Sequence, residues 1–101
     1  MRLSSESRAV IKRAAEASFG GGAVVRLFGS RVDDTKRGGD IDVLIETTLE
    51  DPGQIVFAHT RFLSLLYQQL GEQKIDVLID YPGRKSHPPI FDVARREGLT
   101  L

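Results

Sequence analysis

The chain contains no cysteine and carries no net charge. Without cysteine, disulfide bridges, thiolate zinc sites and cysteine nucleophiles are all excluded. A net charge of zero provides no overall field toward nucleic acid or anionic membrane, so we expect no direct nucleic-acid binding. No apolar run approaches the ~20 residues of a membrane span, and the polar start at Met1–Glu6 lacks a signal-peptide core. These absences predict a cytoplasmic protein without membrane contact.

The composition is that of an ordinary globular protein. The 101 residues include 41% hydrophobic and 28% charged residues, which is typical of folded soluble domains. A chain of this length suits one hydrophobic core rather than two. We therefore expect a single domain over residues 1–101.

Hydrophobic periodicity predicts helices and strands in alternation. Asp51, Pro52 and Gln54 are typical of a helix start, and Gly71 of a helix end. The expected helices run over about Glu6–Ser18, Pro52–Leu70 and Pro89–Glu97, and the expected strands over Ala23–Phe28, Asp40–Glu46, Lys74–Asp80 and Leu99–Leu101. Such alternation predicts an α/β (α+β) fold, in which helices pack on a sheet.

Two of the expected strands have nearly the same sequence. Ile-Asp-Val-Leu-Ile-Glu at 41–46 is matched by Ile-Asp-Val-Leu-Ile-Asp at 75–80. We interpret them as neighbouring strands that each turn an apolar face inward. Since side chains alternate along a strand, Asp42 and Glu46 share one face, and Glu46 and Asp80 are interpreted as solvated strand ends.

The stretch with the clearest chemistry joins Gly29–Ser30 to an Asp-x-Asp pair nine residues later. Asp40 and Asp42 are two residues apart on a strand, so their carboxylates project together. Two such carboxylates repel each other unless a cation joins them. Mg²⁺ is the natural partner, since it binds one or two carboxylates together with substrate phosphates.

The glycine and serine supply the other half of this site. Gly29 allows a ligand to approach the main chain, and Ser30 can cap a short helix that begins at Arg31. The N–H groups of a helix start favour phosphate. Phosphate on one side and metal on the other predict a nucleoside triphosphate site.

This pattern resembles the DNA polymerase β-like nucleotidyltransferase superfamily. The size of the chain and the segment Ile90–Leu99 resemble its minimal nucleotidyltransferase branch. The resemblance implies a small mixed sheet in αβαβαβ order. It also implies ATP as substrate and two Mg²⁺ ions on Asp40 and Asp42. An acid on the next strand, Asp76 rather than Asp80, would complete the metal site and act as base.

The resemblance further implies a protein acceptor and a role for Gly29, Ser30 and Arg31 in nucleotide binding. In relatives of this size the nucleotidyltransferase is an antitoxin that transfers AMP to a tyrosine hydroxyl of a HEPN-domain toxin. One alternative is a binding antitoxin with a weak nucleotide site, which the acidic Asp33 and Asp34 favour. Another is a small-molecule nucleotidyltransferase.

The remaining polar and apolar candidates have structural interpretations. His59 lies on the apolar face of its helix and is expected to be a partly buried core residue. His87 has no acidic neighbour in the sequence and is not expected to be a ligand. Ile90, Val93 and Ala94 are expected to pack the last helix against the sheet.

Overall fold

Three helices and four strands make up residues 3–29 and 41–101, the part of the chain that this computed structural model describes. In chain order they are α1 (Ser5–Phe19), β1 (Val24–Phe28), β2 (Ile41–Glu46), α2 (Pro52–Leu70), β3 (Ile75–Asp80), α3 (Pro89–Glu97) and β4 (Leu99–Thr100). The α/β class is therefore as expected. Strict αβαβαβ alternation would need a helix between β1 and β2, in a connector that lies outside the described residues.

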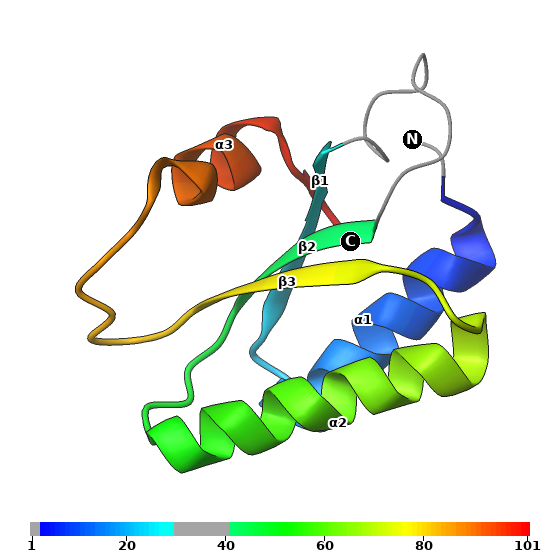
Figure 1. Cartoon of the computed structure of the whole chain (residues 1–101), viewed down its shortest axis with the longest axis horizontal. Coiled ribbons are helices and arrows are strands. Elements are labelled where there is room, and N and C mark those ends of the chain that lie inside the picture. The colour runs from blue at the N-terminus through cyan, green and yellow to red at the C-terminus, as the bar shows by residue number, and fades with distance from the viewer. Residues whose placement is uncertain (1–2, 30–40) are drawn as a thin grey trace.

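The four strands form one mixed sheet in the order β3-β2-β1-β4. β2 runs antiparallel to β1 and parallel to β3, and β4 runs antiparallel to β1. The helices α1 and α2 lie on one side of this sheet and α3 lies on the other (Figure 1). In the described part of the chain, two helices thus form a layer on one face of the sheet and one short helix lies on the opposite face (Figure 1).

The helix ends follow from local chemistry. The Ser4 hydroxyl accepts a hydrogen bond from the Ser7 N–H at 3.0 Å, and the Asp51 carboxylate accepts one from the Gln54 N–H at 2.9 Å. α2 ends at Gly71, whose φ of +80° suits glycine. Among the described helices, none is both long and apolar enough to cross a bilayer.

The main core lies between the sheet and the α1–α2 layer. It takes the odd-numbered side chains of the strands, among them Leu27, Val43 and Ile45, each at 0% exposure. Phe19 and Phe62 meet edge to face beneath the sheet, with ring centroids 6.1 Å apart. Because side chains alternate along a strand, every even-numbered strand residue is left for the opposite face.

A smaller cluster lies on that opposite face, under α3. It consists of Phe28, Leu44, Phe91 and Ala94, with Leu78 packed against it. The even-numbered strand residues on either side of this cluster are acidic or basic, in particular Arg26, Asp42, Glu46, Asp76 and Asp80. The α3 face therefore carries the ionisable groups of the sheet.

We expect Phe62→Ala to lower the free energy of unfolding by about 3–5 kcal/mol, because it leaves a cavity in the main core. Phe57→Ala is the matched control on the same helix, since Phe57 is 69% exposed and Phe62 is 0% exposed. The control should change stability by no more than about 0.5 kcal/mol. Urea unfolding followed by circular dichroism measures both, and equal losses would contradict the core assignment.

Candidate functional site

The pairing of three strands sets Phe28, Asp42 and Asp76 in one row across the sheet. Asp42 is the register partner of Phe28 on β1 and of Asp76 on β3. Neighbouring strands lie about 4.8 Å apart, and register partners project from the same face. Asp42 and Asp76 are thus immediate neighbours on the α3 face, Asp42 half-buried and Asp76 exposed.

Gly29 lies against this row, at the end of β1. Its φ is +76°, a conformation that favours glycine. A Cβ at this position would lie 3.2 Å from Cγ of Asp42 and would overlap its Oδ2. Only a residue without a side chain lets the carboxylate of Asp42 approach the backbone so closely. The glycine and one aspartate of the sequence motif are therefore in direct contact.

The structure brings together three of the six expected site residues. Gly29, Asp42 and Asp76 meet at the same end of the sheet, whereas Ser30, Arg31 and Asp40 lie outside the described residues. Within residues 3–29 and 41–101 there is no group of three acidic, histidine or cysteine residues that could hold a metal ion. The role of these residues as ligands stays a prediction.

The rival third acid, Asp80, does not share this location. It is four residues along β3 from Asp76, which corresponds to about 13 Å at the rise of a strand. Its register partner is Glu46 and not Asp42. Of the two candidates on β3, Asp76 is thus the acid beside Asp42.

The residues that meet here are chemically suited to a hard divalent cation. Asp42 and Asp76 offer carboxylate oxygens from neighbouring strands, the donor type that Mg²⁺ selects. Two adjacent carboxylates also repel each other, so a cation between them relieves an unfavourable interaction. The backbone of Gly29 is exposed beside Asp42.

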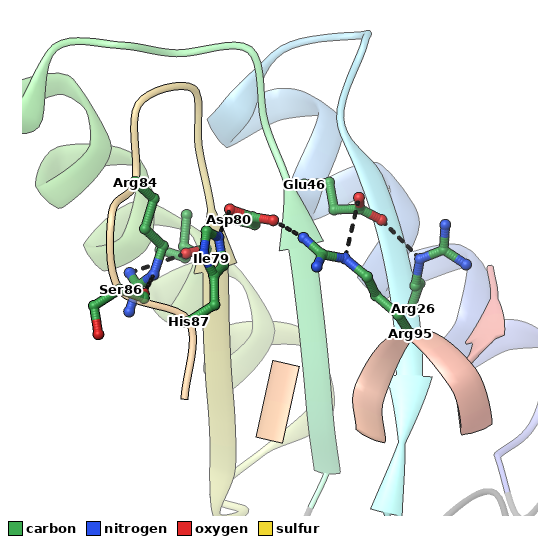
Figure 2. A network of polar contacts seen from close by, with 8 residues as sticks. All are labelled: Arg26, Glu46, Ile79, Asp80, Arg84, Ser86, His87 and Arg95. Atoms are coloured by element: carbon green, nitrogen blue, oxygen red, sulfur yellow. Dashed lines mark hydrogen bonds and ion pairs between the residues drawn. The ribbon is translucent and has the colours of Figure 1, made fainter. Parts of the chain in front are cut away.

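A second acidic row crosses the same face at the other end of the strands. Glu46 and Asp80 are register partners, with side chains 32% and 16% exposed. Arg95 of α3 lies between them and contacts both carboxylates, reaching Asp80 through Nη2 and Glu46 through Nε at 4.0 Å (Figure 2). Nε of Arg26 donates to Glu46 at 2.7 Å. Cations of the protein itself thus neutralise this row.

The loop before α3 adds to this network. His87 contacts Asp80 through Nε2 at 2.9 Å, and its ring meets Phe91 edge to face at 5.3 Å. The guanidinium of Arg84 lies over Phe91, 4.6 Å from the ring centroid, while Nη1 donates to the Ile79 carbonyl at 3.3 Å. These contacts fix the start of α3 against the end of β3.

Two interpretations from the sequence were wrong here. Glu46 and Asp80 are not solvated strand ends, since both form ion pairs. His87 has no acidic neighbour in the sequence but contacts Asp80 in the structure, and that it is not a ligand stays a prediction. Ile90 is 42% exposed and does not pack as expected, whereas Ala94 is buried and Val93 is partly buried. The repeated strand sequence, which pairs Glu46 with Asp80, was the available signal for the first of these.

Comparison with models of known protein families found no match, and comparison with curated proteins found none either. The resemblance that the motif suggests therefore stays a hypothesis. The interpretation of the site rests on the contacts of Gly29, Asp42 and Asp76.

We expect Gly29→Ala to destabilise the protein more than Gly83→Ala does. Both glycines have positive φ, +76° and +86°, so both substitutions introduce about 1 kcal/mol of backbone strain. A Cβ at Gly83 meets open space, whereas one at Gly29 overlaps the Asp42 carboxylate. Chemical unfolding gives the free energy of unfolding of each variant, and the difference between the two values is the cost of this overlap. Equal losses of stability would show that Asp42 does not lie against Gly29.

Proposed function

We propose that this protein is a cytoplasmic, Mg²⁺-dependent nucleotidyltransferase that transfers AMP from ATP to an acceptor hydroxyl. One observation carries the proposal: Asp42 and Asp76 are register partners on neighbouring strands, with Gly29 against the Asp42 carboxylate. This arrangement combines an acidic pair with exposed backbone, as a metal-bound triphosphate requires. The absence of any net charge agrees with a small-molecule substrate rather than a nucleic acid.

In this proposal Asp42 and Asp76, together with Asp40, hold the metal, and the superfamily resemblance implies two Mg²⁺ ions. When bound, these ions supply charge stabilisation for the triphosphate and for the oxygens that attack and leave. Asp42 is half-buried and held against Gly29, so it can act as the fixed ligand. Asp76 is exposed on the outer strand, where it remains accessible to an incoming acceptor.

The nucleotide would lie along Gly29, with Ser30 and Arg31 on its phosphates. The acceptor oxygen forms a bond to the α-phosphorus while the bond from that phosphorus to the bridging oxygen breaks, and pyrophosphate leaves. The hydroxyl proton passes to Asp76. Positioning and electrostatics supply most of the rate in phosphoryl-group chemistry of this kind.

The acceptor in this proposal is a tyrosine hydroxyl of a HEPN-domain toxin, so that the protein acts as an antitoxin. The superfamily resemblance of the segment from Gly29 to Asp42, and of Ile90–Leu99, is the support for this partner. The side chain of Asp76 is exposed on the α3 face of the sheet. A protein side chain could therefore approach it, which a closed small-molecule pocket would not allow.

Metal binding is tested by comparing Asp76→Asn with Asp80→Asn, two substitutions on the same face of β3. We expect Mg²⁺ to raise the melting temperature of the wild type and of Asp80→Asn but not of Asp76→Asn, because only Asp76 neighbours Asp42. Without metal, Asp76→Asn should leave stability unchanged or raise it by a few tenths of a kcal/mol, since it removes a like-charge contact. Asp80→Asn should lower it by about 1 kcal/mol through its lost ion pairs.

Thermal unfolding with and without MgCl₂ provides all of these values. A full Mg²⁺ response of Asp76→Asn would contradict the proposed metal site. Equal loss of the response in both variants would point to general electrostatics rather than to a site at Asp76.

Catalysis is tested by reconstitution with α-labelled ATP, Mg²⁺ and a HEPN-domain toxin as acceptor. We expect label on the partner, and a loss of at least about a hundredfold with Asp42→Asn, because the metal loses a ligand. Asp92→Asn is the control, an exposed carboxylate on α3. Silencing of the toxin by Asp42→Asn without labelling would support the binding antitoxin instead. Label on a small hydroxyl compound alone would support a small-molecule nucleotidyltransferase.

A further inference from the structure

The strand β3 ends the sheet on one side, in the described part of the chain. The N–H of Ile41 donates to the Lys74 carbonyl, and the N–H of Thr47 donates to the Asp80 carbonyl, each at 3.0 Å. In a parallel pair the N–H and C=O of one residue point to the same neighbour. The even-numbered residues of β3 therefore pair with β2, and Ile75, Val77 and Ile79 direct their backbone groups outward.

An apolar stripe of α2 borders this outer edge. Val56, Thr60, Leu63 and Tyr67 are spaced by three or four residues, so they share one side of the helix. Val56 is 66% exposed and lines a shallow hollow with Tyr81, just after β3. Tyr67, 43% exposed, lines another with Gln73 and Lys74, just before β3. The stripe carries no charged residue, and its two ends lie beside the two ends of the strand.

We infer that a second copy of this chain docks on this surface, with β3 pairing antiparallel to β3 of the other copy. This inference does not depend on the proposed function. An unpaired strand edge is a template for another strand, and a two-fold axis would extend the sheet across both copies. Ile75, Val77 and Ile79 then form the hydrogen-bonded pairs. One of the acceptors, the Ile79 carbonyl, also accepts a hydrogen bond from the Arg84 guanidinium.

Charge selects the register of this pairing. Two registers allow most of β3 to pair with β3 of the second copy. One centres on Leu78 and sets Asp76 opposite Asp80 of the second copy, and the two-fold axis repeats this contact. The other centres on Val77 and sets Lys74 opposite Asp80 of the second copy, and Asp76 opposite Leu78. Directly opposed like charges are unfavourable and opposed unlike charges favourable. The register centred on Val77 is thus the self-complementary one.

The existing partners of Asp80 fit this register. Its carboxylate already contacts Arg95 and His87, so Lys74 of the second copy would join a network of cations around one acid. The main effect of these charges is to exclude the register in which Asp76 lies opposite Asp80 of the second copy. The pairing thus depends chiefly on backbone hydrogen bonds and apolar contact.

The same register aligns the two helices. With the strands antiparallel about Val77, the end of one β3 that carries Tyr81 faces the end of the other that carries Gln73. Val56 lies beside Tyr81, and Tyr67 lies beside Gln73. Val56 of one copy therefore comes opposite Tyr67 of the other, and the strand edge and the helix stripe are covered together. The strand edge and the helix stripe, two independent features of this surface, thus both fit a second copy of the chain.

The mass of the protein in solution tests the association. Sedimentation equilibrium should give twice the 11.2 kDa of the single chain. Val56→Glu should weaken the dimer by at least about tenfold, since it introduces a charge into the covered stripe. Phe57→Glu is the matched control: Phe57 is exposed to the same degree, at 69%, but lines a hollow with Ser18 and Leu49 on another side of α2.

Cysteine cross-linking tests the register. The chain has no cysteine, so a single introduced thiol gives an unambiguous product. Val77→Cys should form a disulfide-linked dimer on mild oxidation, since hydrogen-bonded partners lie about 5.5 Å apart at Cα. Leu78→Cys should not, because it faces itself only in the rejected register.

A monomer over a wide range of concentrations would overturn the inference. So would equal effects of Val56→Glu and Phe57→Glu, or a disulfide at position 78 in place of position 77. Circular dichroism of each variant confirms that it is folded before its mass is interpreted.

Discussion

The in-register, parallel pairing of β2 with β3 is the constraint on which the rest of this structure depends. The two strands have almost the same sequence, so pairing them in register sets like residues side by side at every step. For isoleucine, valine and leucine such ladders are favourable, because apolar side chains pack across the strands. For the acids they are not, because directly opposed like charges are unfavourable.

The two acidic pairs lie in different surroundings. Glu46 and Asp80 receive Arg95 from α3, which therefore contributes to holding the helix on the sheet as well as to neutralising the pair. Exposed ion pairs contribute little individually, but here a single guanidinium separates two carboxylates that would otherwise repel each other. At the other end of the strands, Asp42 lies against Gly29, and Asp76 is its register partner. In the proposed function this pair, together with Asp40, holds the metal.

The sequence predicted the local features of the fold well, because these depend on residues close together in the chain. The limits of α2, its cap at Asp51 and its end at Gly71 all follow from capping chemistry and were confirmed. The contact between Asp42 and Asp76 could be anticipated from the near-repeat of two strands. The network around Asp80 could not, since Arg95 follows it by fifteen residues and approaches only when α3 folds back over the sheet.

The strand β3 therefore presents its residues in a different order to its two neighbours, β2 on one side and β3 of a second copy on the other. Inside the chain, in-register parallel pairing with β2 sets acid beside acid. Across the outer edge, antiparallel pairing with a second β3 reverses the order of residues, so that the basic start of the strand meets its acidic end. In the proposed function and the proposed dimer, the short sequence Lys74–Asp80 thus supplies a metal ligand on one side and a self-complementary edge on the other. Strand direction and register together determine which charges come face to face.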